Sequence, residues 1–298
     1  MEAHIIMSLF NPNGRKKALS VRKSSTQIMP KNNVQKKENT IAVEHYPTEE
    51  DIEISYINTN MSSALNEQET ANIMDSGNIP DYKYKCLDRV KYINLLGYVE
   101  SIGKEAFNHC TDLEKIVIAS NTDTLSIGKS AFENCISLKE IDFKGRFTYI
   151  GENAFSNCSA LEKINLAGLS NINANCFLLD FALKEVNCVS VMNIASGAFL
   201  GCRSLETFYF GKNIKVIGSF AFSNCAFKEL HLPKSITTIN GYAFEDNFDL
   251  TDVYFEHDTG SEIELGENIF KHCKNVVIHS KNKSIIDYCN KNKYIVGD

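Results

Sequence analysis

Apolar and polar residues alternate along the last two thirds of this chain in a phrase that recurs. It reads I-G-x-x-A-F-x-x-C-x-x-L-x-x-I-x-F, where x marks variable positions, and its copies begin 22 to 26 residues apart. A period in the twenties is typical of a solenoid of stacked coils. One coil cannot bury its own apolar face, so neighbouring coils must form the core together. The copies open at Ile102, Ile127, Ile150, Ile172, Ile194, Ile217, Ile239 and Leu265.

An aromatic residue occupies the fifth position after the opening residue in every copy. Aromatic rings contribute a large share of a protein core. Rings at equivalent places in stacked coils therefore predict a continuous aromatic spine. These residues are Phe107, Phe132, Phe155, Phe177, Phe199, Phe222, Phe244 and Phe270.

The second half of each phrase predicts a short β-strand. In Leu138, Ile141 and Phe143 the I-x-F end alternates with period two, which is typical of a strand with one buried face. Stacked copies would pair these strands in parallel, with one circuit of the coil as the crossover. We interpret the Ile-Gly pair that opens four of the eight copies as a turn. The expected fold is a right-handed superhelix of short parallel strands joined by short helical or irregular turns.

The phrase resembles the leucine-rich repeats of the BspA-like family, of the treponemal type. Three copies carry the resemblance most closely: IGKSAFENCISLKEIDF from Ile127, IGENAFSNCSALEKINL from Ile150 and IGSFAFSNC from Ile217. The resemblance covers about residues 90–298. The family occurs in bacteria and in some protozoan parasites. The resemblance implies a surface adhesin or an interaction protein, and it implies no catalytic residue.

The repeat boundaries divide the chain into four parts. We expect a disordered tail over residues 1–80, a half-repeat capping the stack over 81–101, eight repeats over 102–280 and a C-terminal cap over 281–298. In the first cap, Ile93 and Leu95 would form a strand. In the second, Ser284 would cap a short helix, and a final strand would follow at 294–296.

Charge is segregated within the predicted tail. Residues 1–37 hold eight Lys or Arg and one acid, whereas residues 38–80 hold nine acids and no Lys or Arg. Low hydrophobicity with many charges favours disorder. The basic part could bind nucleic acid or an anionic membrane. The alternative is a solvated tail that pairs loosely with the acidic stretch behind it.

Ten cysteines are present, and six share one repeat position. We favour a column of buried thiols that behave as small apolar groups. Disulfides between neighbouring coils are a second interpretation, because stacked strands lie about 5 Å apart. Metal binding is the third, but no C-x-x-C pair occurs and we expect no metal site. The column is Cys110, Cys135, Cys158, Cys202, Cys225 and Cys273.

Outward residues of the predicted strands form the candidate binding surface. Tyr209, His231 and Tyr254 would lie in line, flanked by Glu229 and Asp252. Exposed tyrosines are frequent hot spots, and the histidine would make binding sensitive to pH. Ordinary β-propensity also explains aromatic residues on strands. The candidate surface also includes the outward residues of earlier predicted strands, which are Asp142, Asn165 and Asn187.

The remaining chemistry favours recognition over catalysis. The net charge is −6, which argues against general binding of nucleic acid. Phosphate-loop, nucleophile-elbow and zinc-protease motifs are missing, so we expect no enzyme and no cofactor. Apolar runs are too short to span a membrane. Near the N-terminus a short apolar patch precedes the basic residues, the reverse of a signal peptide.

Two main functional hypotheses follow. The first is a monomeric, cytoplasmic scaffold that binds a protein or a glycan, favoured by the free thiols and the lack of a signal peptide. The second is a cell-surface or exported adhesin for a host or matrix protein, released without a leader. Tail-driven binding of nucleic acid or an anionic membrane is a third hypothesis.

Overall fold

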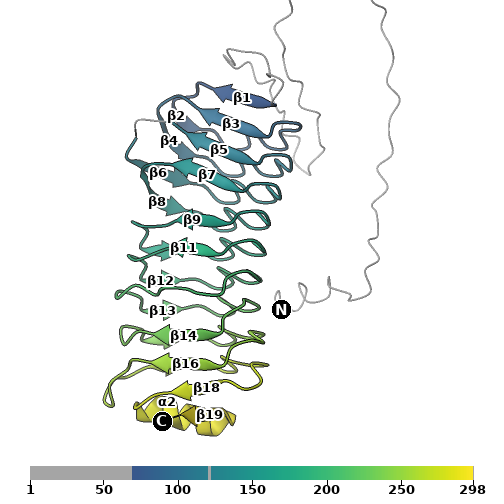
Figure 1. The fold of residues 1–298 in the computed structure, drawn as a ribbon. Helices are drawn as coiled ribbons and strands as arrows, with labels where there is room; N and C mark the ends of the chain where they lie inside the picture. The colour runs from purple at the N-terminus through teal and green to yellow at the C-terminus, as the bar shows by residue number, and fades with distance from the viewer. Residues whose placement is uncertain (1–68, 120–121, 298) are drawn as a thin grey trace, which may run out of the picture. The chain divides into compact units, whose positions relative to one another are not determined.

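The computed structural model describes residues 69–119 and 122–297, which form a β-solenoid of stacked coils (Figure 1). The stack has about nine turns, its strands are parallel, and it contains little helix. Predictions for residues 1–68, which include the basic segment and most of the acidic one, lie outside the described residues. The expected solenoid is confirmed.

The first row of strands contains the I-x-F segments of the repeat. All its strand pairs are parallel, and they form sheets in the orders β1-β3-β5-β7, β9-β11 and β14-β16-β18-β19. We call the outward surface of this row the strand face. Its members are β1 (Thr70–Ile73), β3 (Tyr92–Leu95), β5 (Lys115–Ile118), β7 (Glu140–Phe143), β9 (Lys163–Asn165), β11 (Glu185–Asn187), β14 (Glu229–Leu232), β16 (Asp252–Phe255), β18 (Val277–His279) and β19 (Ile295–Gly297).

A second row of strands runs along another side of the stack, in the orders β2-β4-β6-β8 and β10-β12-β13-β15-β17. The sequence interpretation of Ile-Gly as a turn was incomplete, because the isoleucine ends a strand of this row. The row comprises β2 (Gly77–Ile79), β4 (Val99–Ile102), β6 (Thr124–Ile127), β8 (Arg146–Ile150), β10 (Asn171–Ile172), β12 (Asn193–Ile194), β13 (Val216–Ile217), β15 (Thr238–Ile239) and β17 (Glu264–Leu265).

The glycine after this isoleucine lets neighbouring coils approach closely. A Cβ atom on Gly128 would lie 2.7 Å from the carbonyl carbon of Gly103. A Cβ atom on Gly151 would lie 2.5 Å from the amide nitrogen of Lys129. Backbone atoms fill both places, so any larger residue would push the coils apart.

The turn after each glycine contains left-handed residues at two repeat positions. In the coil that opens at Ile127 these are Ser130 (φ 53°) and Asn134 (φ 64°). Asn, Asp and His tolerate this conformation better than most residues do. This explains why the residue before the column cysteine is often one of these three. Residues in the turns also bond from coil to coil, as when the Phe107 amide donates to the Ala131 carbonyl at 2.8 Å.

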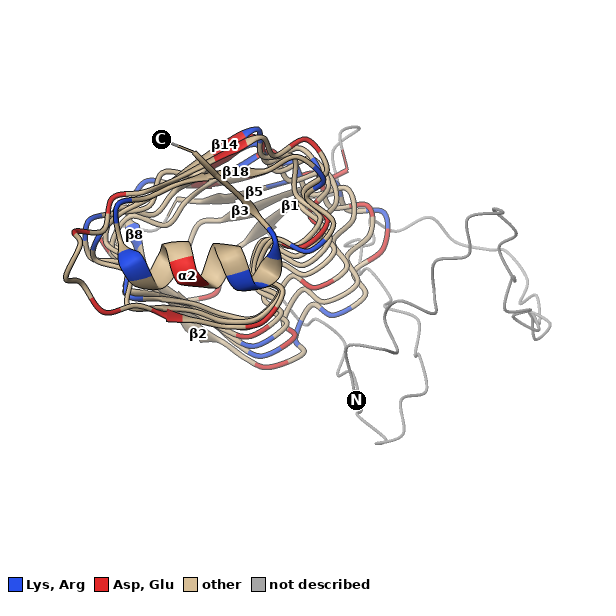
Figure 2. Cartoon of the chain, turned by 90° about the horizontal axis from the view of Figure 1, so that it is seen from below, with Lys and Arg blue, Asp and Glu red and all other residues tan. Residues whose placement is uncertain are grey.

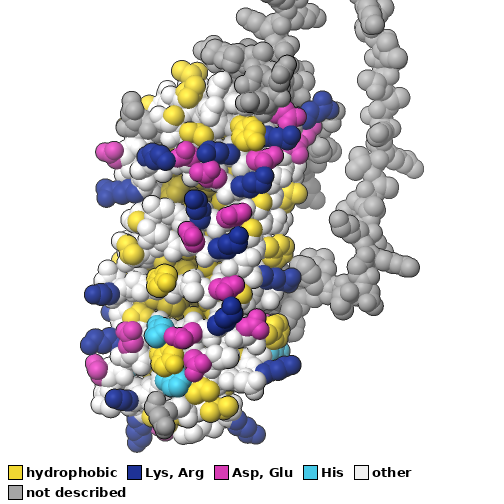
Figure 3. All heavy atoms as spheres, viewed as in Figure 1, with side chains coloured by type: hydrophobic (Ala, Val, Ile, Leu, Met, Phe, Trp, Pro, Cys, Tyr) yellow, Lys and Arg dark blue, Asp and Glu magenta, His cyan; other side chains and the backbone are white. Residues whose placement is uncertain are grey.

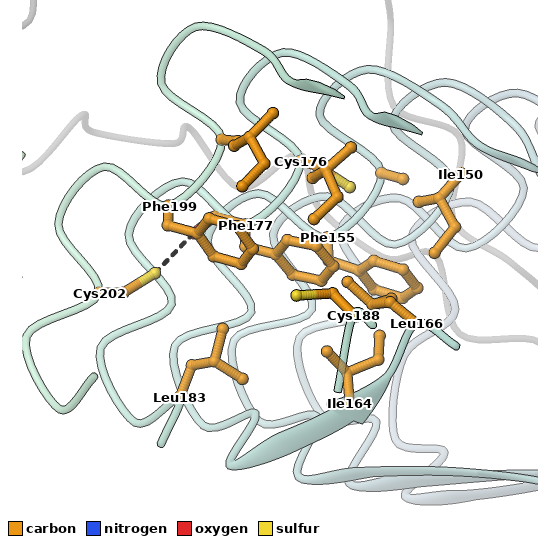
Figure 4. Packing of buried hydrophobic residues seen from close by; sticks show 14 of the residues in the cluster. Ile150, Phe155, Ile164, Leu166, Cys176, Phe177, Leu183, Cys188, Phe199 and Cys202 are labelled. Carbon is orange, nitrogen blue, oxygen red and sulfur yellow. Dashed lines mark hydrogen bonds between the residues drawn. The ribbon is translucent and has the colours of Figure 1, made fainter. Parts of the chain in front are cut away.

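The predicted aromatic spine is present, and Figure 4 shows its rings at Phe155, Phe177 and Phe199. Consecutive rings from Tyr84 to Phe270 lie 5.2 to 5.6 Å apart between centroids and within 13° of parallel. The spine residues are almost fully buried. Dispersion and burial of these rings join each coil to the next.

The solenoid begins earlier than the sequence predicts. Tyr84 stacks on Phe107 at 5.2 Å, so the expected half-repeat is a complete ninth coil that opens at Ile79. Strands β1 and β2 lie within the last part of the predicted tail, and the tail boundary at residue 80 was therefore wrong. The pattern was missed because Pro80 replaces the glycine, Tyr84 the phenylalanine and Leu87 the cysteine.

All ten cysteines are free thiols, and the six of the column are buried. Each column thiol donates to the main-chain carbonyl of the spine residue one coil earlier; for Cys135 the acceptor is Phe107, at 3.1 Å. Burial raises the pKa of the Cys135 thiol well above its ordinary value. Neutral, hydrogen-bonded thiols fit the interpretation of the column as small apolar groups.

Two copies replace the column cysteine with a polar residue. Asn247 Nδ2 preserves the pattern by donating to the Phe222 carbonyl at 2.8 Å. Asp180 Oδ1 instead accepts from the Cys158 amide at 2.8 Å. Among the described residues, Asp180 Oδ2 has no hydrogen-bond partner, although the side chain is fully buried. A buried acceptor without a partner destabilises the fold.

The last coil ends in helix α2 (Lys283–Asn292), which lies across this end of the stack in Figure 2. Its N-cap is Asn282 rather than the predicted Ser284: the Asn282 side chain accepts from the amides of Ser284 and Ile285. Asn282 Nδ2 also donates to the carbonyls of Asp258 and Ser261. These tertiary bonds fix Asn282 at the helix start. Strand β19 follows, close to the predicted position.

Candidate functional site

The strand face falls into three zones that differ in chemistry. Strands β1 and β3 place uncharged polar residues outward, β5 to β11 alternate Lys with Glu, and β14 to β18 combine rings with carboxylates. Figure 3 shows the charged side chains in the middle of this face and two histidines, with a hydrophobic side chain between them, further along. The third zone contains the expected binding residues.

Three rings in the third zone stack on one another, and we call them the aromatic ladder: His231, Tyr254 and His279. The His231 and Tyr254 rings lie 4.9 Å apart and 11° from parallel. The Tyr254 and His279 rings lie 4.4 Å apart and 10° from parallel. Strand register causes this, because His231 pairs with Tyr254 and Tyr254 with His279 in the sheet.

Each histidine of the ladder contacts a carboxylate. His231 Nε2 lies 2.5 Å from Glu229 Oε1, and His279 Nε2 lies 2.9 Å from Asp252 Oδ1. Hydrogen bonds from His279 and then Thr251 lower the pKa of Asp252. Desolvation, followed by the charge of Asp252, raises the pKa of Tyr254, which therefore stays a neutral phenol. The ladder thus presents ring edges and two paired carboxylates.

His279 was missed by the sequence interpretation. In the preceding coil Val253, the inward residue of β16, comes three residues after Leu250. In the last coil Ile278, which pairs with Val253, comes only two residues after Val276. Counting along the repeat would therefore point His279 inward. The shortened spacing was the signal available in the sequence. The pairing of Tyr254 with His279 shows that His279 lies on the outward side of the strand.

Tyr209 does not belong to the ladder. Residues 207–210 have no regular strand structure, and Tyr209 is 79% exposed. Among the described residues, no ring contact joins Tyr209 to His231. Tyr209 therefore points outward as expected but lies outside the stack of rings, and its place in a binding surface stays a prediction. Its neighbours explain this, because Phe208 and Phe210 pack edge-on against Phe222, with centroids 4.8 and 5.6 Å away.

The remaining predicted residues lie in the middle zone, apart from the ladder. Asp142 contacts Lys144 at 2.8 Å and Lys115 at 3.9 Å, and the Lys144 hydrogen bond lowers its pKa. Asn165 Oδ1 accepts from the Ala167 amide at 3.1 Å and so shapes a turn. Asn187 is exposed and pairs with Asn165 in the sheet. These three residues belong to a separate surface, on which lysine and carboxylate side chains pair with one another.

A group of possible metal ligands lies elsewhere, in the turns of the last two coils. Ligand atoms of Glu245, Asp246 and His272 lie within 4.8 Å of one another. His272 Nδ1 contacts Asp246 Oδ1 at 2.7 Å, and Lys271 Nζ contacts the buried Glu245 at 3.0 Å. The lysine already offsets the buried charge. Asp246 and His272 occupy the left-handed turn position, so the fold accounts for their proximity.

The repeats match the BspA type leucine-rich repeat region in 6 copies, over residues 77–192 and 170–296. This covers more than half of the chain, and the chain therefore belongs to the BspA type leucine-rich repeat family. Members of such families are generally interaction or surface proteins. No curated protein matches the chain.

Two solved structures share the fold. A leucine-rich repeat protein from Bacteroides ovatus is 21% identical, with a TM-score of 0.55, over 77% of this chain and 71% of that one. A leucine-rich cell surface protein from Faecalibacterium prausnitzii is 20% identical, with a TM-score of 0.50, over 72% of this chain and 73% of that one. At this identity they show the architecture alone.

Within residues 69–119 and 122–297, no helix is long and apolar enough to cross a bilayer.

Proposed function

We propose that this protein is a non-enzymatic recognition scaffold that binds a protein partner through the aromatic ladder. The observation that carries the proposal is the stack of His231, Tyr254 and His279 on an open sheet. Tyrosine is enriched among residues that dominate interface affinity. Stacked rings lose little further freedom on binding, which lowers the entropic cost of association.

The flanking carboxylates support a polar rim around this surface. Glu229 and Asp252 already contact the two histidines, so they remain partly paired before a partner binds. An apolar centre with a polar rim is the usual anatomy of a protein interface. In this proposal Asp142, Asn165, Asn187 and Tyr209 are peripheral and contribute less to affinity.

Affinity capture with the full chain tests the proposal. The ladder variant would combine His231→Ser with Tyr254→Ser, and Tyr149→Ser is its matched control because Tyr149 is an exposed ring on the second strand row. We expect a protein retained by wild type and by the control to bind the ladder variant at least about tenfold more weakly, or about 1.4 kcal/mol. Unchanged affinity of the purified partner for the ladder variant would contradict the proposal.

A surface adhesin is the alternative function, and the cell-surface description of the F. prausnitzii structure favours it. The free, buried cysteines favour the cytoplasmic scaffold instead, because disulfides are rare in reducing compartments. Biotinylation of intact cells with a membrane-impermeant reagent separates them. Labelling of this protein supports the adhesin, whereas labelling only after lysis supports the scaffold.

A further inference from the structure

A groove of about 340 Å³ lies on the strand face at the opposite end from the ladder, over β1, β3 and β5. Register builds it from two rows of side chains that cross the three strands. One row is Thr70, Tyr92 and Lys115, and the other is Asn72, Asn94 and Val117. We call it the N-terminal groove. The fully buried Ile93 lies beneath it.

The walls of the N-terminal groove present oriented, uncharged hydrogen-bonding groups. Asn94 Nδ2 donates to Asn72 Oδ1 at 2.8 Å, which fixes the plane of the Asn94 amide. Tyr92 contributes an aromatic ring that is 37% exposed. Thr70 adds a hydroxyl beside it. Amide, hydroxyl and phenol groups both donate and accept hydrogen bonds, so they suit a ligand rich in hydroxyl groups.

Charged ligands fit the groove poorly. Among the described residues that line the groove there is no carboxylate, so none of these side chains recognises a cation. Lys115 is the one cation among the described lining residues, and its Nζ contacts Glu140 Oε2 at 2.9 Å and Asp142 Oδ2 at 3.9 Å. An anion would have to compete with both carboxylates. The ammonium still has donors for a neutral hydroxyl, because it carries three N–H groups.

Apolar ligands and added strands fit poorly as well. Val117 and the Tyr92 ring are the apolar surfaces that line the groove above Ile93. The backbones of β3 and β5 beneath the groove are each paired on both sides, so neither strand offers an edge to a peptide. A flat ring with hydrogen-bonding neighbours matches a sugar ring, whose C–H face packs on an aromatic ring while its hydroxyls bond to the rim.

We propose that the N-terminal groove binds a neutral saccharide. Tyr92 supplies the packing surface, the Asn94 amide and Thr70 hydroxyl bind sugar hydroxyls, and Lys115 donates a further hydrogen bond. This site is separate from the aromatic ladder and does not depend on the proposed protein partner. The groove volume lies near the lower end of that of small-molecule sites, about 300–1,000 Å³.

Saturation-transfer NMR on the full chain tests the proposal with methyl glycosides of glucose, galactose, mannose and N-acetylglucosamine. We expect transfer to at least one glycoside, at an affinity that stays constant between low and high salt. Tyr92→Ala should weaken that affinity at least tenfold. Val117→Arg should weaken the affinity as well, because the larger side chain fills the groove. This second variant keeps the test valid if Tyr92→Ala does not fold. Tyr149→Ala, which removes an exposed ring on the second strand row, is the matched control and should leave binding unchanged.

Three outcomes would overturn the proposal. The first is no transfer to any of the four glycosides. The second is binding that survives in a folded Val117→Arg variant, which would place the sugar elsewhere. The third is binding confined to a sulfated glycoside and lost at high salt, which would indicate an anion site instead.

Discussion

The aromatic spine and the strand face contain residues of the same coils, yet they differ in how strictly the repeat constrains them. Eight coils place Phe in the spine and the ninth places Tyr84. On the strand face the outward residues change from Asn to Lys and Glu and then to His and Tyr. A spine ring contacts its counterparts on both sides, whereas an outward residue needs only to suit a strand.

The largest effect should come from breaking the spine at its centre. Phe177 stacks on Phe155 and Phe199 at 5.6 and 5.2 Å, so Phe177→Ala leaves a cavity between two coils. We expect a loss of about 3–5 kcal/mol in the free energy of unfolding, measured by urea denaturation. Tyr209→Ser, on the exposed face, is the control and should leave the unfolding midpoint unchanged. Similar losses in both variants would show that the spine has no special role.

A second prediction concerns Asp180, the carboxyl within the cysteine column. Burial raises the pKa of Asp180 well above its ordinary range, against the opposing hydrogen bond from Cys158. The folded chain therefore holds this proton more tightly than the unfolded chain. Stability from this group is complete below the unfolded pKa of about 3.9, and it is lost as the pH rises toward the folded pKa.

Asp180→Asn should remove that dependence, because an amide can donate as Asn247 does at the equivalent position. At neutral pH we expect the variant to unfold with a free energy larger by about 1–3 kcal/mol. The advantage should shrink toward acidic pH in urea denaturation at a series of pH values. Asn247→Asp is the reciprocal variant and should introduce the same loss with rising pH. A difference between wild type and Asp180→Asn that is constant with pH would refute the explanation.

The smallest effect should come from single thiols of the column. Cys135→Ser can keep a donor to the Phe107 carbonyl, whereas Cys135→Ala cannot. We expect Cys135→Ala to lower the free energy of unfolding by about 1 kcal/mol.

A thiol reagent added to native protein should label the half-exposed Cys86 before the nine buried cysteines. Equally rapid labelling of the column would show that these coils open readily.

Features that depend on a repeated position could be predicted, and features that depend on a departure from the repeat could not. The Phe spine, the buried thiols and the outward direction of His231 and Tyr254 all follow from counting along the phrase. Tyr84 was missed because its coil departs from the phrase at several positions, among them the glycine, the phenylalanine and the cysteine. Asn282 was missed because its role as a cap depends on bonds to Asp258 and Ser261, which are distant in sequence.

The sequence by itself determined that this chain stacks coils around an aromatic spine, because repeated apolar spacing leaves no other way to bury those faces. Only the tertiary structure decided which outward residues meet. Coil lengths vary, and a change of one residue turns a side chain to the opposite face of a strand. That change brings His279 onto Tyr254, and the parallel register of β1, β3 and β5 assembles the N-terminal groove.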